Sequence, residues 1–592
     1  GHDTSGDETG TTYTNIEGKN ITIENANDIR GAGDKKSLGM IVTGAKAKDG
    51  SETPGVITAK AAGNADITLF GKAASDQIDI EAGDLTLTSR GDISDGSYKA
   101  KNALRVHTAK DGIISGGNFS GGTADITNAG TITNGSYIAE TGAMTVTNSG
   151  KLSSGTYTAK AGTMDITNEG TIENGTYTAR GDLTYTDIAK SSLEPSLTDG
   201  TLISKEGKAT ITAHGVLQIK KLRAKKSATV EADQDVTLNE AEAGTLAISS
   251  GGSVNAGTLT AKTGDAKVTA KKDVTIGTLD VKEHAELTSG GDMVLHEAEV
   301  GGTLTADAGG SISVKGTDAK ISAADITMHA GEDIRITDRS LVGKLDGVDT
   351  SVPAGSTTGS GAAGSFVTGE AKPHDFDASG KGSALLSSAG GKVTLSAKKV
   401  EIDTLKNGEG NAADLTISAD NIGIDDLAGT GAQHVTIHGK DGQSQAHYAG
   451  IHSTSAGGTL VKDSAVEHLE LTGREPLGLS NTAIGGDSVL ATDKIRVTIQ
   501  KNPGSSQAEH FGNLSLSGYD IATDHVMTSV KGGLTVNGER FPATAESVMN
   551  ASLYEDRTLG RDGREKEEET EKDSPSLAFG APNEKEAYEV VK

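Results

Sequence analysis

Residues 123–181 read TADITNAGTITNGSYIAETG, AMTVTNSGKLSSGTYTAKAG and TMDITNEGTIENGTYTARG, which are three consecutive versions of one unit. Equivalent residues recur 20 positions apart, as from Asn128 to Asn148 to Asn168. The repeated positions hold asparagine, glycine, an aliphatic residue and tyrosine: Asn128, Asn148 and Asn168; Gly130, Gly150 and Gly170; Ile132, Leu152 and Ile172; Gly135, Gly155 and Gly175; Tyr137, Tyr157 and Tyr177. A fixed period of this length is typical of repeat architectures.

Within each unit, apolar residues alternate with threonine and serine over short runs, and glycine or asparagine separates the runs. Alternation of period two predicts strands, and the separating residues predict turns. A unit of two or three short strands does not bury its own apolar face, so it must stack on its neighbours. The sequence therefore predicts an all-β chain that folds as a parallel β-solenoid, with one unit of about 20 residues in each coil.

Stacking predicts columns of identical side chains. Asn128, Asn148 and Asn168 are expected to bond to one another along the stack, as asparagine ladders do. Tyr137, Tyr157 and Tyr177 form a second column, which either stacks inside the coil or coats one of its faces. The sequence leaves these two positions for the tyrosines open.

Composition favours a thin core. The 592 residues include 80 glycines, and only 3% are aromatic, which is few for the large cores of a globular enzyme of this length. The formal net charge of −27 disfavours nucleic acid as a partner and suits a solvent-exposed chain. The chain has no cysteine, which excludes disulfides and thiolate chemistry, and no run of 18 apolar residues, so membrane insertion is not predicted.

The pattern divides the chain into five segments. Residues 1–14 are polar, residues 15–339 carry solenoid repeats, and residues 340–384 are a loop insertion rich in glycine, serine and threonine. Residues 385–550 continue the solenoid less regularly, and residues 551–592 are a charged tail.

After residue 200 the repeat takes a second form, with units of 18 to 20 residues such as those around Ile211, Val230 and Ile248. Each unit carries a second strand, and Gly-Gly or Lys-Lys pairs such as 251–252 and 271–272 mark a corner before it.

These units, of the form A-x-[LIV]-T-A-x-x-D-[LV]-T-[LI], resemble the haemagglutinin-repeat exoproteins, that is, filamentous haemagglutinin and related two-partner-secreted adhesins. The resemblance implies a right-handed parallel β-helix that is exported to the bacterial cell surface or medium and acts in adhesion, biofilm formation or cell contact. The Asn-Pro-Asn signatures of the family's secretion domain do not occur in this sequence. The resemblance then implies an inner or C-terminal portion, or a relative that is exported by another route.

Two RGD tripeptides are candidate receptor-binding residues: Arg90, Gly91 and Asp92, and Arg180, Gly181 and Asp182. Haemagglutinin-like adhesins are known for an RGD, so the resemblance implies integrin binding. Gly-Asp pairs are also ordinary turn chemistry, and the two copies occupy different phases of the repeat. The turn interpretation is therefore favoured.

A basic cluster on this acidic chain is a candidate glycan-binding site: Lys220, Lys221, Arg223, Lys225 and Lys226. It is suited to a sulphated glycan or a phosphate-bearing surface polymer. The alternative, which is favoured, is a solvated edge that discourages strand pairing.

Metal binding and catalysis are both disfavoured. His434, His438, His447 and His452 lie close in sequence, but no carboxylate partner is visible beside them. No serine–histidine–aspartate set, phosphate-binding loop or paired-carboxylate motif stands out, and aromatic platforms for sugars are scarce. No cofactor or catalytic residue is predicted.

The sequence thus predicts a secreted or cell-surface rod that adheres to a glycan or protein of a host or neighbouring cell, with possible self-association into filaments. A polysaccharide-binding or polysaccharide-degrading β-helix protein, similar to a tailspike, is the alternative. A passive spacer that lifts another domain off the cell is a third interpretation.

Overall fold

The computed structural model describes residues 57–70, 78–188, 195–316, 319–337, 382–410 and 412–492, together with isolated strands before and after these ranges. Most of the predicted N-terminal segment 1–14, most of the predicted insertion 340–384 and all of the predicted tail 551–592 lie outside the described residues.

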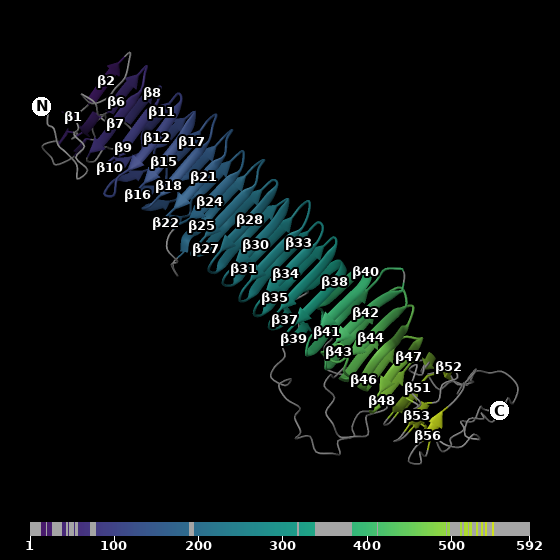
Figure 1. Cartoon of the computed structure of the whole chain (residues 1–592). Coiled ribbons are helices and arrows are strands. Elements are labelled where there is room, and N and C mark those ends of the chain that lie inside the picture. Colours follow the sequence, from purple (N-terminus) through teal and green to yellow (C-terminus); the bar gives the residue numbers. More distant parts are fainter. Residues whose placement is uncertain are drawn as a thin grey trace. The chain divides into compact units, whose positions relative to one another are not determined.

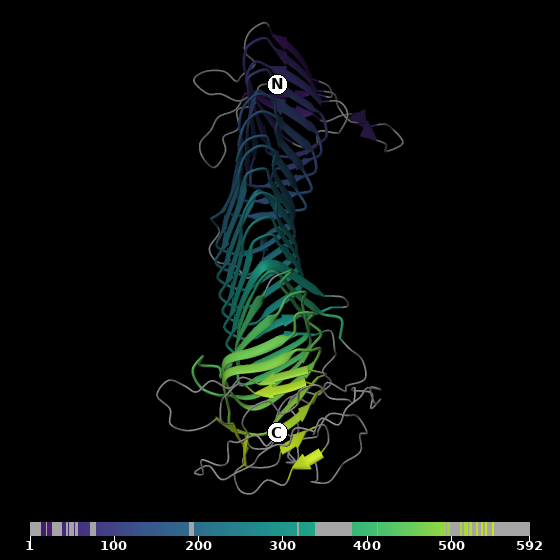
Figure 2. The same cartoon turned by 90° about the vertical axis from the view of Figure 1, so that its right-hand side faces the viewer.

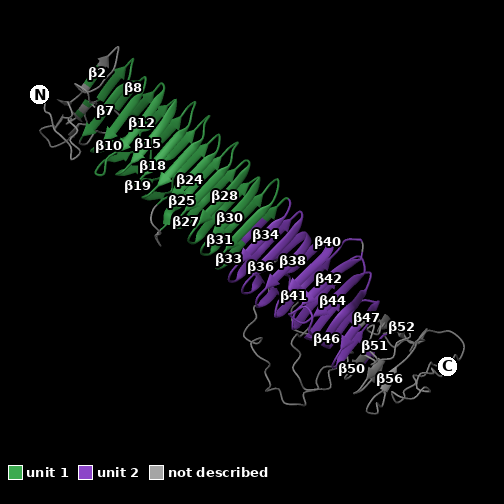
Figure 3. Ribbon diagram, in the orientation of Figure 1, with its two compact units in different colours: residues 1–276, 280–282 green, residues 277–279, 283–592 purple. Residues whose placement is uncertain are grey.

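Every described element is a strand, and the described ranges contain no helix. The chain divides into two compact units (Figure 3): Gly1–Ile276 with Asp280–Lys282, and Gly277–Leu279 with Glu283–Lys592. Both units are a parallel β-solenoid with coils of about 20 residues, consistent with a right-handed β-helix. The predicted fold class is therefore confirmed.

In unit 1, each 20-residue repeat forms one coil of three strands (Figure 1). The strands of three successive coils are β15 Thr123–Asn128, β16 Thr131–Thr133 and β17 Ser136–Ala139; β18 Met144–Asn148, β19 Lys151–Ser153 and β20 Thr156–Ala159; and β21 Met164–Asn168, β22 Thr171–Glu173 and β23 Thr176–Ala179. Each strand pairs in parallel with its equivalent one coil away, so that Asn128 lies opposite Asn148 and Tyr137 opposite Tyr157. Identical side chains therefore form columns.

The earlier coils of unit 1 follow the same order. Their strands are β6 Ile57–Ala61, β7 Ala65–Phe70, β8 Ile78–Ala82, β9 Leu85–Ser89, β10 Asp92–Ser94, β11 Ser97–Ala100, β12 Ala103–Thr108, β13 Ile113–Ser115 and β14 Asn118–Gly121. The turn between the second and third strands needs a left-handed residue, and Asn134, Ser154 and Asn174 adopt φ values of 60°, 59° and 54° there. Asparagine tolerates this conformation, which explains its place before the repeated glycine.

The second form of the repeat begins where two short strands merge into one. β22 and β23 both pair with the single strand β25 Pro195–Ser204, which has register shifts around Gly200. β25 is preceded by β24 Leu183–Asp187, and from there on short and long strands alternate: β26 Ala209–Ala213, β27 Val216–Ala224, β28 Ser227–Ala232, β29 Val236–Ala243, β30 Thr245–Ser250, β31 Val254–Ala261, β32 Ala266–Ala270 and β33 Val274–Val281. The Gly251-Gly252 and Lys271-Lys272 pairs lie at the corners between strands, as predicted.

The core of unit 1 is a set of buried columns. Ile126, Val146 and Ile166 stack at 0–1% exposure. Asn128 donates from its Nδ2 to Oδ1 of Asn148 at 2.7 Å, and Asn148 donates in the same way to Asn168 at 2.7 Å. Each amide also donates to backbone carbonyls of its own coil and of the next one, as Asn148 does to Gly150 and Thr171. The asparagines are thus almost completely bonded inside the core.

The tyrosine column also lies inside the coil. The sequence had left open whether these side chains stack inside or coat an outer face. The rings of Tyr98, Phe119, Tyr137, Tyr157 and Tyr177 are stacked with centroids 4.4–4.8 Å apart and planes within 9° of parallel. All five side chains are 0–1% exposed. Burial raises the pKa of Tyr137 and Tyr177 well above the ordinary value for a phenol, because the ionised form is not solvated there.

Unit 2 keeps the same parallel stacking (Figure 2). Its strands up to residue 492 are β34 Ala285–Ser289, β35 Met293–Val300, β36 Thr303–Ala308, β37 Ile312–Val314, β38 Lys320–Ala330, β39 Asp333–Ile336, β40 Leu385–Ser396, β41 Lys399–Asn407, β42 Ala413–Ser418, β43 Asn421–Ala428, β44 Gln433–His438, β45 Ala446–Ser453, β46 Thr459–Gly473, β47 Leu477–Ile484 and β48 Ser488–Ala491. β38 and β40 lie on either side of the predicted insertion in sequence, yet they pair directly, with Ile326 opposite Val393.

Candidate functional site

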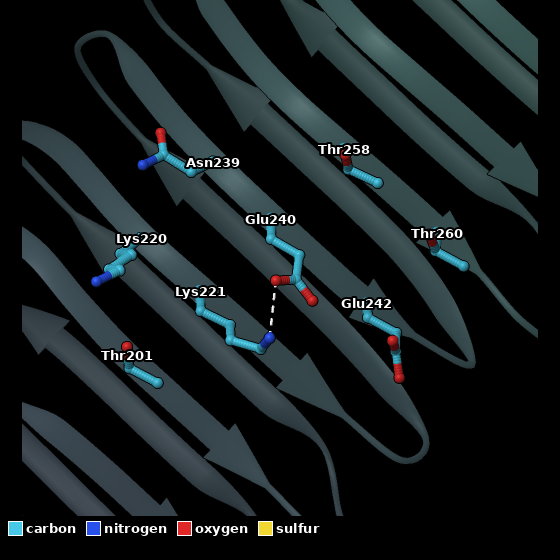
Figure 4. A pocket seen from close by; sticks show the side chains of 8 residues that line it. All are labelled: Thr201, Lys220, Lys221, Asn239, Glu240, Glu242, Thr258 and Thr260. Atoms are coloured by element: carbon cyan, nitrogen blue, oxygen red, sulfur yellow. Dashed lines mark hydrogen bonds and ion pairs between the residues drawn. The ribbon is translucent and has the colours of Figure 1, made fainter.

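A polar shelf lies on the outer face of the long strands β25, β27, β29 and β31 in unit 1 (Figure 4). Leu202, Leu222, Ala241 and Leu259 point inward from these strands and are fully buried. Because side chains alternate across a strand, the residues on either side of them point outward. The strand register therefore aligns Thr201, Lys221, Glu240 and Thr258 in one row, with Arg223, Glu242 and Thr260 in a second row.

The charges of the shelf pair between neighbouring coils. Lys221 Nζ lies 2.7 Å from Glu240 Oε2, and Arg223 Nη2 lies 3.0 Å from Glu240 Oε1 and 3.6 Å from Glu242 Oε2. Lys262 Nζ, one coil further, lies 2.6 Å from Glu242 Oε1. The hydrogen bond from Lys221, followed by that from Arg223, holds the pKa of Glu240 below its ordinary value. Glu240 therefore carries its charge at neutral pH.

The shelf borders a hollow with a volume of about 590 Å³. Every lining residue is polar: Thr201, Lys220, Lys221, Asn239, Glu240, Glu242, Thr258 and Thr260 (Figure 4). Ammonium, amide and hydroxyl groups donate hydrogen bonds here, and the carboxylates, hydroxyls and amide oxygen accept them. This arrangement suits a ligand rich in hydroxyl groups. Glu240 itself does not suit the role of a general acid, because its lowered pKa keeps the carboxyl ionised.

The structure separates the predicted basic cluster into two parts. Lys221 and Arg223 lie on the shelf, where glutamates neutralise them, and Lys220 lines the hollow with an exposed side chain. Lys225 and Lys226 follow the end of β27 and are exposed at a corner outside the hollow. The cluster is therefore not one cationic patch.

Sequence reasoning overlooked the acidic half of the shelf. Glu240 and Glu242 lie 19 residues after Lys221 and Arg223, which is one coil length in this part of the chain. The spacing was a usable signal, because residues one period apart lie opposite each other in a parallel stack.

The two RGD tripeptides lie at different corners, and the structure does not bring them together. In the first, Arg90 directly follows β9, and Arg90, Gly91 and Asp92 are all half-buried. In the second, Arg180 Nε lies 3.1 Å from Glu206 Oε1, and Asp182 Oδ1 accepts the backbone N–H of Lys208 at 2.8 Å. Both charged side chains of the second RGD are therefore bonded to residues of the adjacent coil.

Three of the four histidines have a polar partner, and for two of them, His434 and His447, it is a carboxylate, contrary to the prediction. His434 Nδ1 lies 3.4 Å from Asp414 Oδ1 and His447 Nδ1 lies 2.7 Å from Glu467 Oε2, in each case across one coil. His452 Nδ1 lies 3.0 Å from the hydroxyl of Thr472, while His438 Nδ1 is buried without a hydrogen-bond partner among the described residues. The described ranges contain no group of three or more potential ligands that would hold a metal ion.

Comparisons of this chain with protein-family models, with curated proteins and with solved structures find no match. Among the residues that the structure describes, no helix has the length and apolar character needed to cross a membrane.

Proposed function

We propose that this chain is a surface-displayed or secreted β-solenoid adhesin of the haemagglutinin-repeat kind, and that its polar shelf binds a glycan. The observation that carries the proposal is the hollow over β25 to β31, whose eight lining residues are all polar. A sugar offers hydroxyl groups that both donate and accept hydrogen bonds, and this lining supplies both kinds of partner at fixed spacing.

The physical basis of adhesion here is the rigid presentation of polar groups. The shelf residues project from strands whose inward neighbours are fully buried, so the shelf needs little ordering when a ligand binds. Surface ion pairs such as Lys221–Glu240 contribute about 0–1 kcal/mol each, so a ligand hydroxyl can exchange with them at small cost. A binding site of this kind is weak for one sugar and gains strength by repetition along a cell surface.

A glycan screen with the full chain tests the proposal. The Thr258→Val variant removes one hydroxyl from the shelf with almost no change in shape, and Thr145→Val makes the same change on β18, away from the shelf. We expect Thr258→Val to weaken binding of the best glycan by about three- to ten-fold, which is the usual contribution of one hydrogen bond. We expect Thr145→Val to bind that glycan as the unmodified chain does.

Two outcomes would contradict the proposal. If no glycan is retained, or if both variants bind equally well, the shelf is not a glycan site. A reducing-end assay on the same glycans distinguishes adhesion from the tailspike-like alternative, because new reducing ends appear only when a polysaccharide is cleaved.

A further inference from the structure

A column of cations follows one corner of unit 1. Six cations each come directly after the last residue of a strand, and each backbone N–H donates to the last strand residue of the coil before. The donors and acceptors are Lys160 to Ala139, Arg180 to Ala159, Lys205 to Ala179, Lys225 to Ser204, Lys262 to Ala243 and Lys282 to Ala261, at 2.8–3.1 Å. Gly244 occupies the same position in the coil between Lys225 and Lys262. We call these six cations the corner ladder.

All six side chains of the corner ladder are exposed. Three of them have a carboxylate nearby: Lys160 lies 2.8 Å from Glu140, Arg180 lies 3.1 Å from Glu206, and Lys262 lies 2.6 Å from Glu242. Lys205, Lys225 and Lys282 have no ion pair within the described part of the chain. Exposed pairs contribute little, so all six cations remain available to an external anion.

The opposite corner shows that strands of this solenoid are not generally followed by a cation. There the equivalent column reads Ser149, Glu169, Ile188, His214, Asp233, Gly251 and Lys271. Backbone hydrogen bonds between coils place all of these except His214, which directly follows the end of β26 at Ala213, the residue that accepts the bond from Asp233. That column mixes neutral residues with both signs of charge. Cations thus gather along one line of a chain whose formal net charge is −27.

We propose that the corner ladder binds a linear polyuronate, that is, a polysaccharide with one carboxylate on every sugar. Successive coils are about 4.8 Å apart, and this is similar to the length that one sugar adds to an extended polysaccharide. A polyuronate that lies along the stack therefore presents about one carboxylate to each coil. Each carboxylate accepts charge-assisted hydrogen bonds from one lysine or arginine.

Charge spacing distinguishes this ligand from nucleic acid. Duplex DNA carries one phosphate charge per about 1.7 Å of its axis, which is nearly three charges for each coil. The ladder offers at most one cation per coil, and the carboxylates of Glu140, Glu206 and Glu242 lie beside it. A dense polyanion would be repelled by these glutamates, whereas a polymer with one charge per sugar meets one cation at a time.

The proposal rests on the proposed adhesive function and deepens it by naming a ligand class, but none of the six ladder cations lines the hollow. The test is calorimetric titration of the full chain with oligogalacturonates of two to ten sugars. Between Lys160 and Lys282 the ladder spans seven coils, because Gly244 fills the one position without a cation. We expect affinity to rise with oligomer length up to about seven sugars and then to level off, since longer chains add no new cation.

A pair of charge-matched variants locates the binding. Lys205→Gln with Lys225→Gln removes two unpaired ladder cations, and Lys271→Gln with Lys272→Gln removes two exposed cations from the opposite corner. We expect the first pair to weaken binding by about two- to thirty-fold, the range that two exposed ion pairs supply, and the second pair to leave it unchanged. Far-ultraviolet circular dichroism confirms that both variants keep the β fold.

Three results would overturn the proposal: equal losses in both double variants, affinity that keeps rising beyond about seven sugars, or tighter binding of duplex DNA or dextran sulphate than of polygalacturonate. A failure of the polyuronate proposal can be distinguished from a failure of the proposed glycan site on the shelf. Thr258→Val tests the shelf with uncharged glycans, and the lysine variants leave every residue that lines the hollow in place.

Discussion

Replacing Tyr157 by phenylalanine should stabilise this protein, although it removes a polar group from a repeated position. The hydroxyl of Tyr157 is buried and has no hydrogen-bond partner among the described residues, and the same holds for Tyr137 and Tyr177. Phe119 already occupies an equivalent place in the column and stacks on Tyr137 at 4.6 Å. The column therefore accepts a ring without a hydroxyl.

The magnitude follows from two opposing effects. A buried hydroxyl without a partner costs about 1–3 kcal/mol of folding free energy, because it has lost its bonds to water. Its removal leaves a void of roughly 15 Å³, which costs about 0.4 kcal/mol at the usual rate for core cavities. The net expectation is that Tyr157→Phe raises the local free energy of unfolding by about 0.5–2.5 kcal/mol.

Hydrogen exchange of the full chain, read by mass spectrometry, is the appropriate assay, because stacked repeats open in segments and not as one unit. The amide of Thr176 is a suitable probe, since it donates to the carbonyl of Gly155 in the coil that carries Tyr157. We expect its exchange to slow by about 2- to 70-fold in Tyr157→Phe.

Tyr98→Phe is the matched control. The Tyr98 hydroxyl donates to the carbonyl of Asp95 at 3.2 Å, so its removal leaves that carbonyl without this bond. We expect a loss of about 1 kcal/mol and faster exchange in the surrounding coils. If Tyr157→Phe accelerates exchange as Tyr98→Phe does, the hydroxyl of Tyr157 has a partner in solution and the reasoning is wrong.

Three further perturbations have definite expected outcomes. Asn148→Ala removes the donor that Asn168 Oδ1 accepts from at 2.7 Å and should cost about 3 kcal/mol, seen as faster hydrogen exchange confined to neighbouring coils. Raising the pH above about 10 should destabilise unit 1 by about 1.4 kcal/mol per pH unit for each buried tyrosine. Burial raises the pKa of these tyrosines, so the unfolded chain releases phenolic protons that the folded chain retains. Circular dichroism at alkaline pH measures this loss of stability. The hydrogen bond that protonated His214 donates to the carboxylate of Asp233 raises the pKa of His214, so this pair stabilises the fold below the ordinary histidine pKa and loses its effect as the pH rises through the raised value. An NMR titration should show the histidine pKa fall in Asp233→Asn.

Several features of the fold were predictable because they depend on the spacing of residues along the chain. The recurrence of Asn128, Asn148 and Asn168 predicted parallel stacking, and the structure aligns these residues coil on coil with hydrogen bonds between them. The glycine and lysine corners at 251–252 and 271–272 were predictable for the same reason. A period in the sequence becomes a neighbour relation once coils stack.

The candidate site was harder to predict, because it depends on which residues of adjacent coils meet. The basic cluster drew attention through its charge, but the glutamates that neutralise Lys221 and Arg223 lie 19 residues away in the next coil. The corner ladder has the same origin, since its successive members are separated by 20 to 37 residues along the chain and are aligned only because the coils stack.

By itself, the sequence determined that this protein repeats, that the repeats are strands and turns, and that equivalent residues lie above one another. Because side chains alternate along a strand, either of the two alternating sets of residues can face inward. The sequence pattern therefore did not decide whether the tyrosines lie inside the coil. The tertiary structure decided this: their rings stack inside the coil 4.8 Å apart, which matches the separation of neighbouring strands. Burial of five aromatic rings then offsets the cost of three hydroxyls left without partners, a balance that exists only after the coils have stacked.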